Sequence, residues 1–263
     1  MKLINKIKFS FKLARLGSNL YYRMKLFLFI FFSSVIKFFP IVSRFNININ
    51  NRRFFVYMSA TSDISIFDKI FVQNEYLINP RSKPEIIFDL GSNIGFSVLY
   101  FKSLFPDAHI YAFEPNPLVY SKLESNCRGL LNVQCFNVAI SNLDGEKDFF
   151  VGEKSSLSSS FLKRNESYQS IKVRTRSLDS IVNEQQINNI DLVKFDVEGA
   201  EYDVFINCKK LNKIRDLIGE VHIDLGKFSY NGFSKIFNKN YLINNRRISR
   251  DRFIFKASSI MIE

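Results

Sequence analysis

From Ile86 onward, short apolar runs alternate with amphipathic stretches in the order strand, turn, helix, strand. Ile86–Leu90 predicts a buried strand, and Gly91–Gly95 predicts the turn that follows it. The stretch Phe96–Phe105 predicts a helix that ends before Pro106, and His109–Phe113 predicts the second strand. Strands and helices that alternate in this way predict an α/β fold, with a mostly parallel central sheet and helices on both of its faces.

The same alternation continues toward the C-terminus. A proline near the first turn favours a helix over Pro117–Cys127. Residues 147–176 predict extended hairpins with a polar tip at Ser155–Ser160. The other apolar runs predict strands at Val133–Val138, Asp191–Val197 and Leu217–Leu225, and an alternating tail at Ile248–Ile262.

The first 50 residues follow a different pattern. A helix over residues 8–24 would carry basic side chains on one face and apolar side chains beside them. The uncharged run Leu26–Ile36 follows, and Lys37 and Pro40 interrupt the apolar stretch after it. Because a bilayer span needs about 20 apolar residues, this pattern predicts an interfacial anchor rather than a transmembrane helix. The long basic leader and the lack of a small-residue cleavage pattern disfavour a signal peptide.

Charge is distributed unevenly along the chain. Of the 37 Lys and Arg residues, 11 precede residue 63 and no acidic residue does, whereas the remaining chain is nearly neutral. This asymmetry indicates a basic segment attached to a neutral body. Three interpretations remain open for residues 1–50: peripheral association with a membrane surface, packing on the main domain or on a second copy in a homodimer, and nucleic-acid binding. The last is not expected, because the basic residues cluster beside an apolar run instead of lining a cleft.

Length and composition limit the organisation of the chain. The 263 residues, 46% hydrophobic and 24% charged, are typical of one globular α/β domain with an appendage. We expect a basic, Phe-rich helical extension at 1–53, a lead-in strand and helix at 54–85, and the main domain at 86–263. Three cysteines without a CxxC pair favour a reducing, cytoplasmic compartment, at the inner face of the membrane if the extension is an anchor. With only two histidines besides, no metal site is expected.

Polar residues follow the predicted parallel strands at their carboxyl ends, where open α/β sheets bind ligands. Asp89 and Glu114 end the first two strands, and Asp196 ends a later one. A carboxylate placed like Glu114 can accept hydrogen bonds from both hydroxyls of a ribose. Gly91 and Gly95 would let a ligand approach the backbone of the first turn. The spacing G-x-x-x-G lacks the tight G-x-G turn of nicotinamide enzymes, which disfavours an NAD-dependent oxidoreductase.

Three runs resemble one known family. They are IFDLGSNIGFS (Ile87–Ser97), FPDAHIYAFEPNP (Phe105–Pro117) and LVKFDVEGAEYDVF (Leu192–Phe205). Together they are similar to the FkbM family of S-adenosylmethionine-dependent methyltransferases, for which the D-V-E-G-A-E run is characteristic. The resemblance covers roughly residues 54–225. It implies a Rossmann-like class I methyltransferase fold with S-adenosylmethionine as the cofactor.

The resemblance also implies roles for individual residues. The methionine part of the cofactor would be surrounded by Asp89, Gly91, Asn93 and Gly95, the ribose would be bound by Glu114, the adenine would be flanked by Pro115, Asn116 and Asn137 to Ala139, and the pocket would be closed by Asp196. Structural alternatives exist for three of these residues. Asn93 would instead cap the helix, Pro115 set a turn, and Asn137 satisfy a buried backbone group.

Methyl transfer to a hydroxyl needs a group that takes the hydroxyl proton. Four residues near the strand ends are candidates, and the sequence does not rank them: Asp196, Glu198, Glu201 and His222. Acidic residues at a helix N-terminus also have a purely structural use. The resemblance implies O-methylation of a hydroxyl on a sugar, glycan or natural-product acceptor. The alternative is a catalytically degenerate binding or scaffold protein that keeps the fold, because fold does not determine function.

Overall fold

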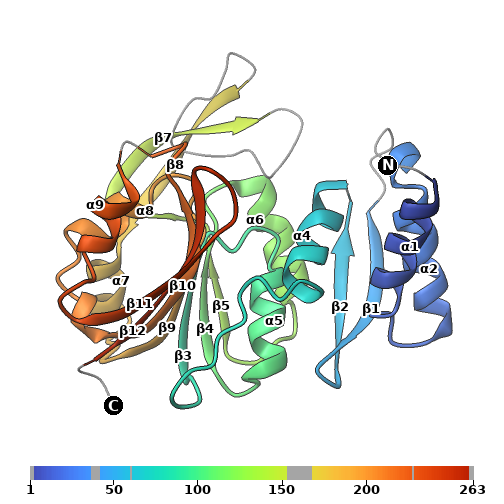
Figure 1. Ribbon diagram of the computed structural model, residues 1–263, viewed down its shortest axis with the longest axis horizontal. Helices are drawn as coiled ribbons and strands as arrows, with labels where there is room; N and C mark the ends of the chain where they lie inside the picture. The colour runs from blue at the N-terminus through green and yellow to red at the C-terminus, as the bar shows by residue number, and fades with distance from the viewer. Residues whose placement is uncertain (1–2, 37–41, 60, 153–167, 227, 261–263) are drawn as a thin grey trace.

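The computed structural model describes residues 3–36, 42–59, 61–152, 168–226 and 228–260. Its main element is a seven-stranded sheet in the order β11-β12-β10-β9-β3-β4-β5 (Figure 1). The five strands from β10 to β5 are parallel, and β12 and β11 are added in antiparallel pairings. The strands are β3 (Ile86–Leu90), β4 (His109–Phe113), β5 (Val133–Phe136), β9 (Ile190–Phe195), β10 (Ile214–His222), β11 (Tyr241–Arg247) and β12 (Arg252–Ser259).

The strand order creates a switch point beside β3. The chain runs outward from β3 through β4 to β5, and then returns to β9 on the other side of β3. Ligand sites of open α/β sheets lie at the carboxyl ends of the strands at such a point. The fold class expected from the sequence, a Rossmann-like sheet of the class I methyltransferase type, is confirmed.

Helices cover both faces of the sheet (Figure 1). On one side lie α5 (Phe96–Leu104) and α6 (Pro117–Cys127), with α4 (Thr61–Phe71) packed outside α5. On the other side lie α7 (Leu178–Glu184), α8 (Glu201–Ile206) and α9 (Tyr230–Lys235), and a short 3-10 turn spans Leu211–Lys213. Each face has its own apolar cluster, one around Phe96 and Phe101 and the other around Phe195 and Phe233.

The predicted elements of the main domain are largely confirmed. The strands β3 and β4 and the helix α6 have the expected bounds, and α5 ends one residue early. The alternating tail proved to be only part of the edge, because a second strand, β11, pairs with β12 outside it. The residues around 147–176 form β7 (Gly145–Gly152) and β8 (Tyr168–Ser177). In a separate small sheet, β8 lies between β7 and β6 (Ala139–Ser141) and pairs with both. The Ser155–Ser160 tip lies outside the described residues.

The N-terminal region corrects two expectations. A single helix over residues 8–24 is wrong: α1 (Leu3–Ala14) and α2 (Leu20–Phe31) are separated at Gly17, which forms a β-bridge with Ile47. The region is also not purely helical, since the short α3 (Ser33–Ile36) is followed by the hairpin β1 (Ser43–Ile49) and β2 (Arg52–Met58). The expected boundary after residue 53 therefore cuts through β2.

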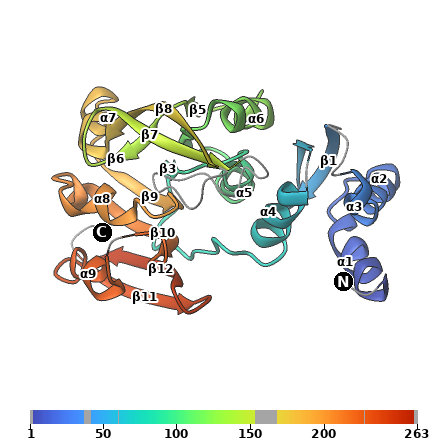
Figure 2. The ribbon, with the colours of Figure 1, turned by 90° about the horizontal axis from the view of Figure 1, so that it is seen from above.

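The helices α1 and α2 pack on this hairpin at the far end of the molecule from α9 (Figure 2). Their buried side chains, such as Leu26 and Phe29, belong to the same apolar cluster as α4 and α5. Among the described residues, no helix is long and apolar enough to cross a bilayer.

Candidate functional site

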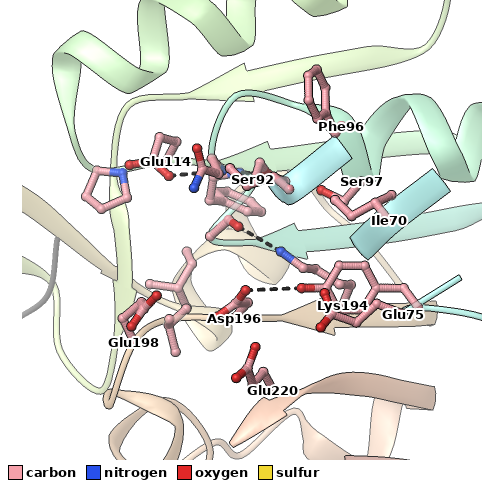
Figure 3. Close-up of a pocket in the computed structure, with 18 of the residues that line it drawn as sticks. Ile70, Glu75, Ser92, Phe96, Ser97, Glu114, Lys194, Asp196, Glu198 and Glu220 are labelled. Carbon is pink, nitrogen blue, oxygen red and sulfur yellow. Dashed lines mark hydrogen bonds between the residues drawn. The ribbon is translucent and has the colours of Figure 1, made fainter. Parts of the chain in front are cut away.

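A cleft lies at the carboxyl ends of the parallel strands (Figure 3). One wall comes from the turn after β3 and from the end of β4, where Glu114 and Pro115 lie. The opposite wall carries Asp196 and Glu198, just beyond β9, and Glu220 of β10. The topology thus brings Glu114 together with acidic residues that lie 82 to 106 positions further along the chain.

Glu114 is a buried carboxylate that lines the cleft. Its side chain accepts hydrogen bonds from two backbone N–H groups, Asn93 at 3.0 Å and Asn116 at 2.9 Å. Burial raises the pKa of Glu114 to about 7, although these two N–H donors and Lys194 act in the opposite direction. A carboxylate has about four acceptor positions, so Glu114 retains acceptor capacity toward the cleft.

The glycines of the first turn serve protein packing. Gly91 has φ +73°, and a Cβ built on it would lie 2.0 Å from the carbonyl oxygen of Asp196. Gly95 has φ +89°, and its Cβ would lie 2.9 Å from Leu123 Cδ1. The close neighbours that exclude a side chain are therefore parts of the protein, whereas the sequence suggested that they make room for a ligand. Gly91 lines the cleft and Gly95 does not.

Asn93 lines the cleft and also has the local role that was considered for it. Its side-chain oxygen accepts a hydrogen bond from the N–H of Ile94 at 2.8 Å, and its φ is +50°. The helix α5 begins after Gly95, and no side chain caps its first turn. The N–H groups of that turn point toward the region where an anion would be stabilised.

Asp89 lies beneath the cleft and does not line it. Its fully buried carboxylate forms an ion pair with Lys194 at 3.0 Å and accepts a hydrogen bond from Ser97 at 2.5 Å. Lys194 also donates to the carbonyl of Gly91 at 2.7 Å. Asp89 thereby holds Lys194 against the first turn, and its assignment to the methionine part of the cofactor stays a prediction.

The residues expected around the adenine divide into two groups. Pro115 and Ala139 line the cleft. Asn137 satisfies backbone groups, since its side-chain amide donates to the carbonyls of Glu114 at 2.8 Å and Pro115 at 3.0 Å. Asn116 caps α6 through a 3.0 Å hydrogen bond from Leu118. The two asparagines therefore shape the end of β4 without lining the cleft.

Three of the four candidate proton acceptors cluster around His222. The side chain of His222 is buried, and its Nδ1 lies 2.8 Å from an oxygen of the fully buried Glu201. Its Nε2 lies 3.8 Å from an oxygen of Asp196 and 3.8 Å from one of Glu198. Burial disfavours a charged imidazole, but Glu201 and the other carboxylates outweigh it and raise the pKa of His222 to about 10.

The carboxylate of Asp196, just beyond β9, is held by Tyr76 from the segment between α4 and β3. Its Oδ2 accepts a hydrogen bond from the hydroxyl of Tyr76 at 3.1 Å. Burial alone would raise the pKa of Asp196, but His222 and Lys194 lower it overall. Asp196 therefore remains a carboxylate where it lines the cleft.

Several lining residues were not singled out from the sequence. Glu220 lies on β10 with its oxygens 3.7 Å from Lys69 and 3.6 Å from Arg252, and burial raises its pKa. The other lining residues that were missed include Lys69, Glu75, Tyr76, Lys194 and Arg252. An acid near the carboxyl end of a predicted strand was a signal for Glu220. No comparable signal marks Tyr76, because it comes from the segment between α4 and β3.

Comparisons with known proteins identify the family to which the chain is similar. A family model described as "Methyltransferase FkbM domain" matches residues 89–239. The 2-O-methyltransferase NoeI of Sinorhizobium fredii is 32% identical over 161 residues, which cover 55% of this chain and 66% of NoeI. The hexuronic acid methyltransferase AglP of Haloferax volcanii is 27% identical over 148 residues, covering 56% of this chain and 59% of AglP. The chain thus spans about two thirds of these relatives or less.

A solved structure is also similar. The crystal structure of methyltransferase FkbM from Methylobacillus flagellatus matches with a TM-score of 0.46 and 12% identity. That match covers 97% of this chain and 59% of the other.

Proposed function

The chain belongs to the FkbM methyltransferase family, and from this membership we propose that it is an S-adenosylmethionine-dependent O-methyltransferase whose acceptor is a hydroxyl of a sugar or glycan. The observation that carries the proposal is Glu114, a buried carboxylate at the carboxyl end of β4 that faces a cleft at the switch point of the sheet. A carboxylate in this position is suited to the two hydroxyls of a ribose.

The residues of the cleft fit the cofactor. Two backbone N–H groups fix the carboxylate of Glu114, which leaves lone pairs that would accept hydrogen bonds from both ribose hydroxyls. The uncapped first turn of α5 would bind the carboxylate of the methionine part. Pro115, Ala139 and Ile140 provide an apolar wall next to Glu114 where an adenine ring would lie. These features support a nucleoside with an amino-acid head.

S-adenosylmethionine supplies an electrophilic methyl group on a sulfonium. The protein must hold the acceptor hydroxyl in line with that methyl group and accept the hydroxyl proton as the new C–O bond forms. We assign to Glu220 the role of accepting the hydroxyl proton, because its carboxylate lines the cleft and lies on the wall opposite Glu114. Glu201 and His222 do not line the cleft, so we do not assign the proton to either of them.

The chemistry of the second wall supports a polyhydroxylated acceptor. It carries the carboxylates of Asp196, Glu198 and Glu220, and the cations of Lys69 and Arg252. Carboxylates accept hydrogen bonds from hydroxyls, whereas an apolar acceptor would displace water from these charged groups without offering them hydrogen bonds. The names of NoeI and AglP, a 2-O-methyltransferase and a hexuronic acid methyltransferase, agree with such an acceptor class.

Transfer of a radioactive methyl group from S-adenosylmethionine to a panel of oligosaccharides tests the proposal. We expect label in a saccharide, resistant to mild alkali because it forms an ether, and at least 100-fold slower incorporation with Glu220→Gln. Alkali-labile label would indicate a carboxyl ester, and label on amines would indicate N-methylation. Either result would contradict O-methylation, and the absence of transfer to any acceptor would favour the binding-protein alternative.

We also propose that the N-terminal helices associate with an anionic membrane surface. The side chains of Leu20, Met24 and Leu28 recur every fourth residue on α2, so they share one face, and all three are exposed. Exposed Arg23 lies on the same helix. Exposed apolar side chains next to basic ones are typical of interfacial helices.

Sedimentation with vesicles tests this association. We expect the full chain to bind vesicles that contain phosphatidylserine, and the double variant Met24→Ser/Leu28→Ser to lose most of that binding. Leu131→Ser is the control, because Leu131 is an exposed leucine of the main domain. No binding by the full chain, or equal loss in the control, would contradict the proposal.

A further inference from the structure

A cluster at the edge of the cleft presents three potential metal ligands toward one point. They are the carboxylates of Asp196 and Glu198, just beyond β9, and the imidazole of His222 at the end of β10. One ligand atom from each residue lies within 4.8 Å of the other two. We propose that Asp196, Glu198 and His222 bind a divalent metal ion.

The orientation of His222 is the first argument. Its side chain is 1% exposed, and Glu201 holds its Nδ1 at 2.8 Å. The buried Nε2 has no hydrogen-bond partner among the described residues. Its polar neighbours include carboxylate oxygens of Glu220 at 3.5 Å and of Asp196 and Glu198 at 3.8 Å, none of which can donate a hydrogen bond as carboxylates. An imidazole nitrogen surrounded by acceptors is stabilised by a proton, or by a metal ion that takes the place of that proton.

The carboxylate of Asp196 provides a second observation. Its Oδ2 is occupied by the hydroxyl of Tyr76, whereas its Oδ1 is buried and has no hydrogen-bond partner among the described residues. This Oδ1 is the atom that lies 3.8 Å from His222 Nε2. A buried, unpartnered carboxylate oxygen is costly unless it is paired or coordinates a metal. The two unsatisfied atoms therefore face each other across a gap.

The size of the gap suits an ion. Bonds of about 2.1 Å from a metal to oxygen or nitrogen place two ligands on opposite sides of it about 4.2 Å apart. The separations of 3.8 Å from Nε2 to each carboxylate fall below that limit. The three ligand atoms all lie within 4.8 Å of one another, so the two acidic side chains need to shift only slightly to share one ion. The site is therefore nearly formed in the folded chain.

The backbone around Glu198 supports a specialised position. Glu198 adopts φ +52°, in the left-handed region that a residue with a Cβ rarely occupies, and Gly199 follows with φ +100°. The N–H of Gly199 donates to the same Glu201 oxygen that holds His222. Strained backbone of this kind persists where the surrounding structure requires it, often at functional sites. Glu201 thus orients one ligand and the turn that carries another, as carboxylates behind metal-binding histidines do.

The donor set indicates which ions would bind. Two carboxylates and one imidazole suit Mn²⁺ and Zn²⁺ better than Ca²⁺, which prefers a shell made of oxygen alone. The local charge favours a bound cation, because four carboxylates surround one imidazole. They belong to Asp196, Glu198, Glu201 and Glu220. No metal site was expected from the sequence, because the chain has few cysteine and histidine residues. Here two of the three ligands are acids within the D-V-E-G-A-E run.

The consequence for catalysis rests on the proposed function. An ion with three protein ligands keeps open positions, one of which would hold the acceptor hydroxyl by its oxygen and lower the pKa of that hydroxyl. The hydroxyl proton passes to Glu220, the oxygen forms a bond to the methyl carbon, and the carbon–sulfur bond breaks to leave a neutral thioether. The ion itself undergoes no redox change.

Electron paramagnetic resonance with Mn²⁺ tests the site without cofactor or acceptor. The full chain, freed of metals with a chelator, is titrated with Mn²⁺ while the signal of the free ion is followed. We expect one equivalent to bind, with at least tenfold weaker binding in His222→Gln and Asp196→Asn. Asp224→Asn is the control, since Asp224 is an exposed acid near the end of β10 that pairs with Arg252 instead.

Two further readouts keep the test decisive. Bound Mn²⁺ should show nitrogen modulation in a pulsed measurement, and Glu198→Gln should weaken binding even if the His222 variant fails to fold. Failure of the native chain to bind Mn²⁺ or Zn²⁺, or equal binding by the folded variants, would overturn the inference. Calorimetric titration with S-adenosylhomocysteine separates the two proposals, because loss of cofactor binding with intact Mn²⁺ binding would refute only the proposed function.

Discussion

Substitution of Glu114 by Gln should weaken cofactor binding by an amount that the structure allows us to estimate. The carboxylate would accept hydrogen bonds from two ribose hydroxyls, and hydrogen bonds to a charged group contribute about 1.5–3 kcal/mol each. Glutamine keeps one acceptor oxygen and turns an N–H₂ group toward the second hydroxyl or toward a backbone N–H. Loss of one charged hydrogen bond then corresponds to an increase in Kd of roughly 10- to 150-fold.

The pKa of Glu114 adds a second signature. Because burial raises this pKa to about 7, the fraction of ionised Glu114 increases about tenfold between pH 6 and pH 8. If only the carboxylate form binds the ribose, the affinity of the native chain should rise by up to about tenfold over that range. The Gln variant should lack this component of the pH dependence.

Isothermal titration with S-adenosylhomocysteine at pH 6, 7 and 8 measures both effects. Glu124→Gln provides the control, since Glu124 is an exposed acid on α6 outside the cleft. Equal Kd values for the native chain and the Glu114→Gln variant at pH 8 would refute the assignment of Glu114 to the ribose. So would an equal decrease in affinity for the Glu124→Gln control.

Three further predictions concern stability. Lys194→Met leaves the buried Asp89 carboxylate without its ion-pair partner. It should reduce the free energy of unfolding, measured by urea denaturation, by about 3–5 kcal/mol. The double variant Asp89→Asn/Lys194→Met should recover part of this loss. Gly91→Ala should reduce the free energy of unfolding more than Gly129→Ala does. Both glycines have a positive φ, which costs about 1–2 kcal/mol for alanine, but only Gly91 has a close neighbour. Equal losses of stability would contradict the packing role. Since the folded-state pKa of Glu114 is raised from 4.5 to about 7, its contribution to stability is present below pH 4.5 and is lost as the pH rises through 7. Relative to Glu114→Gln, the native chain should therefore lose on the order of 3 kcal/mol between pH 4.5 and pH 8, and a constant difference would disprove the shift.

The main sheet could be predicted from the sequence because its signals are local. Apolar runs bounded by turn residues locate β3 and β4, and a proline marks the start of α6. Once the strands are parallel, their carboxyl ends share one edge, so the arrangement of Glu114 with Asp196 follows from topology.

Features that depend on long-range contacts could not be predicted in the same way. The break between α1 and α2 reflects the pairing of Gly17 with a strand 30 residues away. Lys194 lies within an apolar strand, and nothing near it in sequence identifies Asp89 as its partner. The approach of Glu201 to His222 likewise depends on how α8 and β10 pack.

Calorimetric titration of the full chain with S-adenosylmethionine and, separately, with NAD tests the central claim most directly. The account predicts binding of S-adenosylmethionine at a single site and no binding of NAD. Binding of NAD in preference to S-adenosylmethionine would contradict the account.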